Sequence, residues 1–250
     1  MSSVLIVTPF YNSFSSFKKT FESVIGQTYS NFEWIIVDDG SSEIEHNNLL
    51  NLVGRENKIR VITGNNNMGA GAARNRGLKF FSHTYLTFID SDDYWDRNFL
   101  ESMISFQRET NARVVFSGYR RYVEKREQFI RPYSFDGRVN SEQILKGNPI
   151  SCLSAFIKPD YSLELPLFGN QVMRNDLVFF YRALMLYGDA VGKNEVLATY
   201  VMRSNSLSRN KLKAIKWQWK VYRQEAGLSL IRSAQFLLAW AFYGYKKYWK

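Results

Sequence analysis

Three aspartates, Asp90, Asp92 and Asp93, directly follow an apolar stretch at residues 85–89. Carboxylates this close raise one another's energy, so a positive charge must compensate them. Mg²⁺ and Mn²⁺ take oxygen ligands and usually bind through one or two carboxylates plus substrate phosphates. The run therefore predicts a divalent metal and a phosphorylated partner. A helix N-cap before residues 99–106 is the alternative, with Asp96 as the candidate, but capping would explain only one acid.

The segment 67–77 is a second candidate for phosphate binding. It places glycines and alanines at a predicted helix start, followed by Arg74 and Arg76. Backbone N–H groups and guanidinium groups both favour phosphate oxygens. Close packing of the small residues on a sheet is the alternative, and both can hold together. The turn at 8–12 contains no glycine, so a dinucleotide-binding fingerprint is absent, and a Walker A motif is absent as well.

These residues follow a regular alternation of strand-like and helix-like segments in the first ninety positions. The alternation predicts a parallel α/β sheet covered on both faces. Polar residues stand just after each strand, where open α/β sheets bind ligands, so the four strand ends are expected to share one site. The predicted strands span 4–8, 34–38, 59–63 and 85–90, and the predicted helices span 14–25, 44–53 and 70–81.

The second half of the chain shows fewer clear patterns. Residues 113–122 and 129–133 are expected to form paired strands, and 151–157 a further strand. A helix is expected over 174–187, with four apolar residues on one face. These residues are Leu177, Phe180, Tyr181 and Leu184.

Four motifs together resemble family 2 of the glycosyltransferases. They are Thr8-Pro9-Phe10-Tyr11-Asn12, Asp38-Asp39-Gly40-Ser41-Ser42, Asn67-x-Gly69-x-x-x-Ala73-Arg74-Asn75-x-Gly77 and Asp90-Ser91-Asp92-Asp93. The motifs cover residues 4 to about 100, and a weaker match continues through Asn175-Asp176 to about residue 206. The resemblance implies an inverting enzyme that uses nucleotide-activated sugars. It also implies a GT-A-type, Rossmann-like and mostly parallel sheet flanked by helices.

The resemblance assigns roles residue by residue. Asp39 would accept a hydrogen bond from the base, most often uracil, and Arg74 would lie near the nucleotide. Asp92 would be the direct ligand of Mn²⁺ or Mg²⁺, and Asp90 would lie near the ribose and the metal. The nucleotide-binding set is Thr8, Pro9, Tyr11, Asp39, Asn67, Gly69, Arg74, Asp90 and Ser91.

The catalytic base is assigned to Asp176, because the family shows Glu-Asp where this chain has Asn175-Asp176. The alternative is that Asp176 only caps the helix that follows. Many relatives carry a histidine near a serine in the region 203–206. This chain has Arg203 there, which leaves metal ligation by that segment open.

The net charge of +10 is concentrated in residues 209–250, which hold ten Lys and Arg and one acid, Glu225. The tail is expected to form an amphipathic helical extension, and its uninterrupted apolar run, 236–245, is far shorter than the roughly 20 residues that span a bilayer. Basic residues beside Trp, Tyr and Leu predict a helix in an anionic membrane interface. Packing on the domain is the alternative. The expected basic stripe is Arg209, Lys213, Lys216, Lys220 and Arg223, and the apolar stripe is Leu212, Ile215, Trp219 and Tyr222.

We therefore expect a glycosyltransferase domain over 1–208, with a nucleotide-binding half (1–100), an acceptor and catalytic half (101–208) and the tail. The expected reaction moves a sugar from a UDP-type donor to an acceptor hydroxyl, on a lipid-linked glycan of a surface polysaccharide. One cysteine and no secretory signal favour a cytoplasmic protein, peripheral on the inner face of the plasma membrane. An inactive sugar-nucleotide-binding module is the alternative. The nearly neutral body argues against a nucleic-acid partner.

Overall fold

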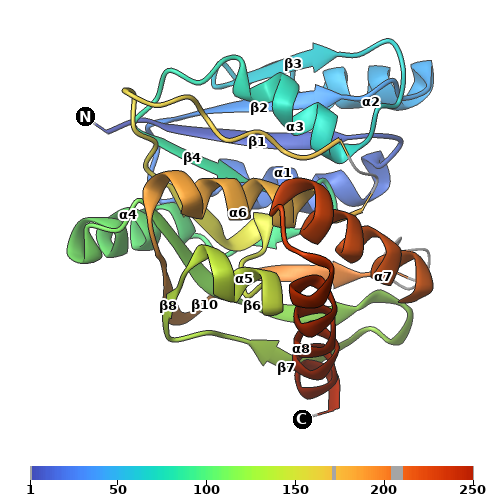
Figure 1. The fold of residues 1–250 in the computed structure, drawn as a ribbon. Coiled ribbons are helices and arrows are strands. Elements are labelled where there is room, and N and C mark those ends of the chain that lie inside the picture. Colours follow the sequence, from blue (N-terminus) through green and yellow to red (C-terminus); the bar gives the residue numbers. More distant parts are fainter. Residues whose placement is uncertain (1, 171–172, 204–210, 250) are drawn as a thin grey trace.

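The computed structural model describes residues 2–170, 173–203 and 211–249, which form one mixed α/β structure around a central sheet (Figure 1). The ten strands have the order β3-β2-β1-β4-β9-β6-β10-β5, with β7 beside β6 and β8 beside β10. The strands are β1 (Val4–Phe10), β2 (Phe32–Asp38), β3 (Ile59–Thr63), β4 (Tyr85–Phe88), β5 (Tyr94–Trp95), β6 (Val114–Val123), β7 (Gln128–Tyr133), β8 (Gly137–Val139), β9 (Ala155–Ile157) and β10 (Ala190–Met202). The helices are α1 (Phe14–Ile25), α2 (Glu43–Val53), α3 (Ala70–Leu78), α4 (Phe99–Thr110), α5 (Ser141–Lys146), α6 (Asn175–Tyr187), α7 (Lys211–Lys220) and α8 (Leu230–Trp249).

The first half contains the predicted parallel unit. Strands β3, β2, β1 and β4 are parallel neighbours, joined by crossovers through α1, α2 and α3. All seven residues of β1 are buried, as expected for a strand covered on both faces. The predicted fold class is confirmed, and the predicted helix over 70–81 ends earlier, at Leu78.

The second half contains antiparallel strand pairs, whereas the sequence predicted a mostly parallel sheet. Strand β9 lies antiparallel between β4 and β6, and β10 runs parallel to β6. The predicted pair of strands is confirmed as β6 and β7, which are antiparallel. Residues 151–157 were expected to be extended throughout, but Cys152–Ser154 form a 3₁₀ turn before β9. The sequence analysis missed β10, whose apolar pattern is interrupted at residues 192–195 and whose pairing with β6 is irregular there.

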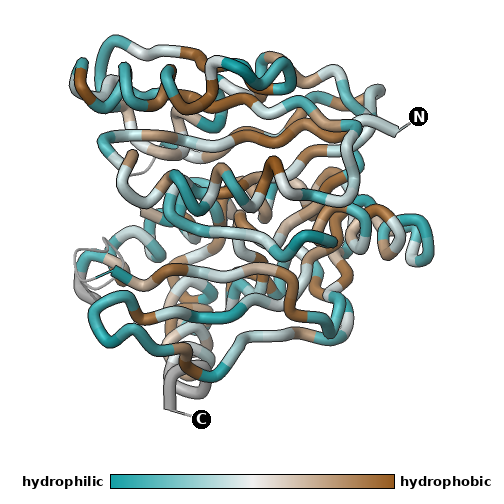
Figure 2. Tube along the Cα trace, turned by 180° about the vertical axis from the view of Figure 1, so that it is seen from behind, coloured by the Kyte–Doolittle hydropathy of each residue, from teal (hydrophilic) through white to brown (hydrophobic). Residues whose placement is uncertain are grey.

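Alternate residues of the parallel strands point into two separate cores. Val4 and Ile6 pack under α1, α2 and α4, whereas Leu5 and Val7 pack under α3 and α6. Figure 1 shows α6 and the tail helices on the near face of the sheet. In Figure 2, viewed from behind, hydrophobic runs follow the central strands and hydrophilic segments follow the outer loops.

The tail packs on the domain through part of its surface. Between α7 and α8 lies a π-helical turn, Val221–Glu225, whose Val221 and Tyr222 are fully buried in the same core as α6. The Tyr222 hydroxyl donates to the Leu145 carbonyl at 2.8 Å, and Arg182 pairs with Glu225 at 2.6 Å. The packing alternative is therefore correct for this segment. No helix within the described ranges is long and apolar enough to span a bilayer.

The buried face of α7 differs from the predicted apolar stripe. Ala214 and Gln218 are buried, whereas Ile215 is 39% exposed, so this face is rotated relative to the prediction. Tyr222 is the one member of the predicted stripe that is fully buried among those described. Arg209 and the side chain of Leu212 lie outside the described residues.

Candidate active site

The three aspartates after β4 point to three different partners. Asp90 pairs with the buried Arg74, and Asp92 Oδ2 lies 3.6 Å from Arg203 Nε. Asp93 is fully buried and accepts a hydrogen bond from the Val201 N–H at 2.8 Å. Asp93 is therefore held by β10, and the pair facing solvent is Asp90 and Asp92, whose side chains are 34% and 32% exposed.

The electrostatics of this pair favour a cation. Burial and the charge of Asp90 raise the pKa of Asp92 to about 6, although Arg203 opposes the shift. Burial also raises the pKa of Asp93 well above its usual value. Arg74 and Arg203 compensate only part of the negative charge. The described residues contain no group of three acid, histidine or cysteine side chains able to hold a metal. Asp90 and Asp92 therefore fit a Mg²⁺ or Mn²⁺ whose other ligands come from a diphosphate and water.

Asp39 directly follows β2, which β1 separates from β4, and one of its two oxygens has no hydrogen-bond partner. Its Oδ2 accepts the N–H groups of Met68 and Gly69 at 2.9 and 2.7 Å. Gly69 has φ +89°, a left-handed conformation that favours glycine. Asn67 Oδ1 also accepts the Gly69 N–H, at 3.0 Å. The second oxygen, Oδ1, is buried and lies 3.8 Å from the Arg76 guanidinium. Such an oxygen can accept a hydrogen bond from a bound nucleobase.

The remaining predicted nucleoside contacts differ in exposure. The Thr8 hydroxyl is fully buried and accepts a hydrogen bond from the Trp34 indole at 2.9 Å, so this side chain belongs to the core. Pro9 is buried as well, whereas Tyr11 is 46% exposed. The Ser91 hydroxyl is 2.8 Å from that of Ser13 at the start of α1. The segments after β1 and β4 therefore lie together. Of the predicted contacts Thr8, Pro9, Tyr11 and Ser91, only Tyr11 and Ser91 have side chains accessible to a ligand.

The α3 segment positions Arg74 through contacts that the sequence analysis missed. The Asn75 side chain bonds both backbone groups of Phe168, donating to the carbonyl at 3.0 Å and accepting from the N–H at 2.8 Å. Phe168 stacks on Phe179 at 4.2 Å, and the Arg74 guanidinium lies 5.1 Å from the Phe168 ring. A Cβ on Gly77 would stand 2.5 Å from Val7, so glycine lets α3 approach β1 closely. The motif itself was visible in the sequence, but its partner Phe168 lies about ninety residues away.

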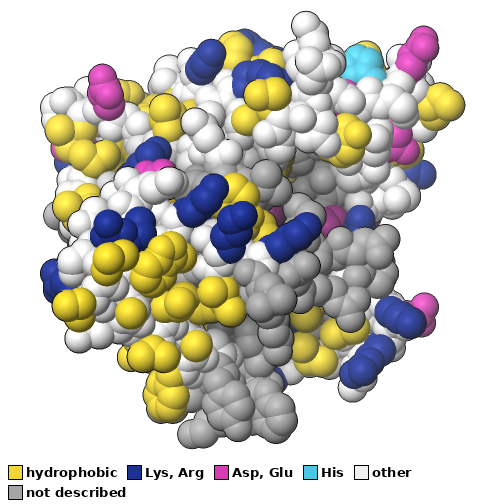
Figure 3. Space-filling model, turned by 45° about the vertical axis from the view of Figure 1, so that its right-hand side comes forward, with side chains coloured by type: hydrophobic (Ala, Val, Ile, Leu, Met, Phe, Trp, Pro, Cys, Tyr) yellow, Lys and Arg dark blue, Asp and Glu magenta, His cyan; other side chains and the backbone are white. Residues whose placement is uncertain are grey.

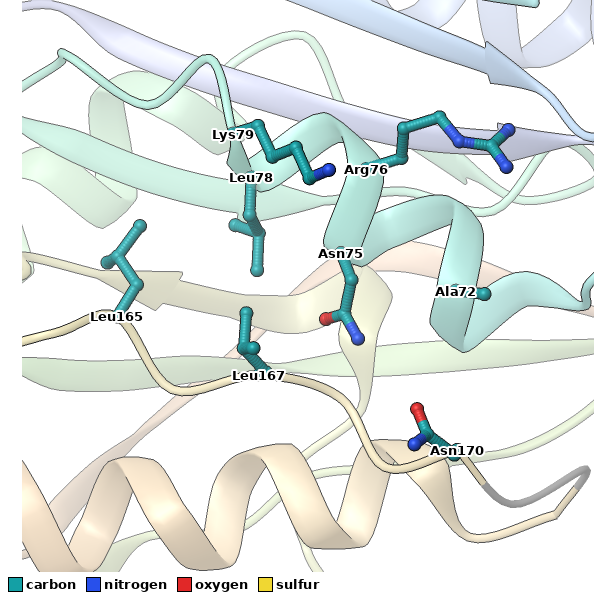
Figure 4. Close-up of a pocket in the computed structure, with 8 residues that line it drawn as sticks. All are labelled: Ala72, Asn75, Arg76, Leu78, Lys79, Leu165, Leu167 and Asn170. Carbon is teal, nitrogen blue, oxygen red and sulfur yellow. The ribbon is translucent and has the colours of Figure 1, made fainter. Parts of the chain in front are cut away.

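A cavity of about 480 Å³ lies beside this anchor, between α3 and the segment 165–170 (Figure 4). Leu78, Leu165 and Leu167 give it an apolar wall, and Asn75 and Asn170 are among its polar lining residues. Neither of the acids Asp90 and Asp176 lines it. The cavity is therefore separate from the acidic site.

Asp176 stands in the first turn of α6 and is not its N-cap. The cap position is Arg174, which has φ +67° and makes no side-chain cap hydrogen bond, so the capping alternative is wrong. The negative charge of Asp176 acts on Arg74 and on the buried Cys152, whose pKa lies above its usual value mainly because of burial. Asn175 packs against α3, where a Cβ on Gly71 would stand 3.0 Å from the Asn175 Cβ. The start of α6 therefore packs on α3, the helix that carries Arg74.

The capping role considered for Asp96 is also wrong. Both of its carboxylate oxygens accept from the Arg120 guanidinium, at 2.8 and 2.7 Å. The N-cap of α4 is Asn98. Asp96 thus joins β6 to the start of α4 and takes no part in the acidic site.

The central sheet and its flanking helices have the GT-A fold of glycosyltransferases. The structure of residues 1–349 of S. aureus TarS with UDP-GlcNAc matches 98% of this chain and 73% of that chain, with a TM-score of 0.71 and 16% identity. A mannosyltransferase of Pyrobaculum calidifontis with GDP-Man and Mn²⁺ matches with a TM-score of 0.69 and 14% identity, over 96% of this chain and 69% of that chain.

The chain belongs to glycosyl transferase family 2, whose family model matches residues 5–165. A Bacillus subtilis glycosyltransferase, assigned provisionally to teichuronic acid biosynthesis, is 31% identical over 98% of this chain and 94% of its own. The Escherichia coli UDP-Glc:alpha-D-GlcNAc-diphosphoundecaprenol beta-1,3-glucosyltransferase WfgD is 28% identical over 98% of this chain and 94% of its own.

Proposed function

We propose that this protein transfers a sugar from a UDP-linked donor, with inversion, to a hydroxyl of a lipid-linked glycan used for a surface polysaccharide. The family supports glycosyl transfer. Two E. coli relatives are named as enzymes that act on GlcNAc-diphosphoundecaprenol with UDP-Glc, which supports the donor and the acceptor class. The S. aureus TarS structure with UDP-GlcNAc also supports a uridine nucleotide.

The position of Asp176 carries the proposal for the mechanism. Its neighbour Asn175 packs on Gly71 of α3, and the charge of Asp176 acts on Arg74, which is paired with Asp90; this supports a base near the proposed diphosphate site. Asp176 would accept the proton of the acceptor hydroxyl while that oxygen attacks the anomeric carbon. Attack on the face opposite the departing diphosphate inverts the configuration. Arg74 is charged and buried, and it would bind a diphosphate oxygen.

Asp90 and Asp92 would hold a divalent cation in this proposal. When bound, that cation would neutralise negative charge on the departing nucleoside diphosphate. The P. calidifontis mannosyltransferase was solved with Mn²⁺, which supports a metal in a protein of the same fold. The Asp39 Oδ1, which accepts no hydrogen bond within the protein, would accept the hydrogen bond of the uracil N–H.

The tail supports a peripheral place on the inner face of the plasma membrane. Its helix α8 exposes Leu230, Ile231, Leu238 and Phe242. On the face drawn in Figure 3, basic side chains lie next to a group of hydrophobic side chains. Such a surface suits the interface of an anionic bilayer, where a lipid-linked acceptor is also found.

The test is a screen of nucleotide sugars with Mn²⁺ or Mg²⁺ and a GlcNAc-diphosphate lipid as acceptor. We expect a UDP sugar to yield a product whose new linkage, read by NMR, has the anomeric configuration opposite to that of the donor. Retention of configuration would refute the mechanism. Tight binding of UDP sugars with no turnover for any acceptor would instead favour the inactive binding module.

A further inference from the structure

A second cleft, of about 730 Å³, opens where the tail helices meet the second half of the chain. Its walls include Arg131 of β7, Arg174 at the start of α6, Gln218 of α7 and Trp240 of α8. Leu177, the residue after Asp176, lines it as well. The cleft therefore reaches the helical turn that carries the proposed base.

The charge of this cleft is one-sided. The described residues that line it include the arginines Arg121, Arg131 and Arg174 and no acidic residue. The Arg121 Nε and its terminal nitrogen both donate to the Arg131 carbonyl, at 2.9 and 2.7 Å, which fixes this guanidinium beside β7. The Arg174 guanidinium lies 5.0 Å from the Trp240 ring, and its Nε is buried without a hydrogen bond. Three arginines, with no acid among the described lining residues, suit a ligand with several negative charges.

A buried polar side chain in the same wall is incompletely hydrogen-bonded. Gln218 is fully buried, and neither its amide nitrogen nor its amide oxygen makes a hydrogen bond of normal geometry. Its polar neighbour is the Tyr222 hydroxyl, which interacts with the Gln218 side chain and donates its own proton to the Leu145 carbonyl. A buried amide with incomplete hydrogen bonding destabilises a fold. A ligand with hydroxyl groups would supply the missing hydrogen bonds.

We propose that this cleft binds the diphosphate and the adjoining sugar of the lipid-linked acceptor, an assignment that rests on the proposed function. The three arginines bind the phosphate oxygens, and Gln218 bonds a sugar hydroxyl. The rings of Tyr133 and Trp240, which also line the cleft, give the sugar an apolar surface. The bound sugar then presents its hydroxyl at the first turn of α6, beside Asp176. Because α7 and α8 supply part of the wall, the C-terminal helices complete the acceptor site.

The experiment measures binding of GlcNAc linked through a diphosphate to farnesol, by calorimetry with the full chain saturated with UDP. Farnesyl diphosphate, free GlcNAc and farnesol are the comparison ligands. Gln218→Leu and Arg131→Ala are expected to weaken binding of the glycolipid at least tenfold, with UDP affinity unchanged. Arg126→Ala, an exposed arginine in the turn between β6 and β7, is the matched control and should bind like the parent.

A second readout separates binding from folding. Gln218→Leu removes an incompletely hydrogen-bonded amide from the interior, so its thermal midpoint should stay close to that of the parent. The inference is overturned if both variants bind the glycolipid as the parent does, or if the parent binds it no better than farnesol. If transfer occurs but these variants leave the acceptor KM unchanged, the cleft assignment alone is wrong. If no donor gives product while the cleft variants still lose binding, the proposed function alone is wrong.

Discussion

At the scale of residues, two arginines offset the electrostatic repulsion among the aspartates after β4. Arg74 takes the charge of Asp90, and Arg203 lies near both Asp92 and Glu124. Burial first, and then the charge of Asp90, still raise the pKa of Asp92 against the opposing charge of Arg203. A bound cation would oppose this rise, because a positive charge beside a carboxylate lowers its pKa. The same residues can therefore form ion pairs without a ligand and hold a metal with one.

The metal assignment predicts the effect of Asp92→Asn. An amide is a weaker metal ligand than a carboxylate, so the Mn²⁺-dependent affinity for the donor should fall. Removing a residue that only supports a metal ligand already lowers affinity about tenfold or more, so we expect at least that loss here. Transfer should be abolished, whereas the fold should persist because the change relieves repulsion. Calorimetric titration of UDP with and without Mn²⁺ measures this. Asp136→Asn, at an exposed position, is the control, and an unchanged Mn²⁺ dependence in Asp92→Asn would refute the assignment.

The base assignment predicts a different pattern for Asp176→Asn. The amide cannot accept the proton of the acceptor hydroxyl, so kcat should fall by about 10²–10⁴ while donor affinity stays nearly unchanged. Steady-state rates and UDP titrations measure the two quantities separately. The matched control is Asp189→Asn, an exposed acid just after the other end of α6. A variant at 176 with turnover close to that of the parent would place the base elsewhere.

At the scale of elements, the close approach of α3 to β1 brings Arg74 to the acid pair. Gly77→Ala would place a methyl group 2.5 Å from Val7 Cγ1, and overpacking of this kind costs about 1–3 kcal/mol. Urea unfolding should show that loss, together with weaker donor binding. Gly244→Ala, on α8 with open space around it, is the control and should keep or slightly raise stability. Equal stability of Gly77→Ala and the parent would contradict the packing argument.

The elements were predictable where local pattern and packing agree. The Val- and Ile-rich β1 and β2 are buried on both faces, so composition alone indicated them. Strand β10 was missed because its interruptions are compensated by pairing with β6, about seventy-five residues earlier in the chain. For the same reason the sequence could indicate Arg74 and Asp90 as site residues but not the contact of Asn75 with Phe168. Contacts between distant segments leave no local signal.

At the scale of the molecule, the tail has a buried face and an exposed apolar face. Val221 and Tyr222 belong to the core, so removal of residues 209–250 would open that core as well as remove membrane contacts. Substitutions on the exposed face of α8 are therefore the sharper test. Leu238 and Phe242, 73% and 56% exposed, can be changed without disturbing the packed side.

The membrane assignment predicts that the parent sediments with anionic vesicles and that salt weakens this binding only in part. Basic residues each contribute about 1 kcal/mol near an anionic surface, and this part is screened, whereas burial of apolar groups is not. Leu238→Asn with Phe242→Asn should reduce the salt-resistant fraction. Ile44→Asn with Leu50→Asn, an exposed apolar pair on α2, is the control. If both double variants sediment with the vesicles to the same extent as the parent, α8 does not face the bilayer.

The single cysteine gives this molecule an internal reporter of opening. Cys152 is buried in the 3₁₀ turn before β9, and its pKa lies above its usual value, so the reactive thiolate is scarce and shielded in the native state. Alkylation by iodoacetamide must then wait until the structure around β9 opens. The labelling rate, followed by mass spectrometry, should be far slower than for the urea-unfolded chain, and it should slow further if a bound nucleotide stabilises the native state. Labelling as fast as in the unfolded chain would show that this turn is open in solution.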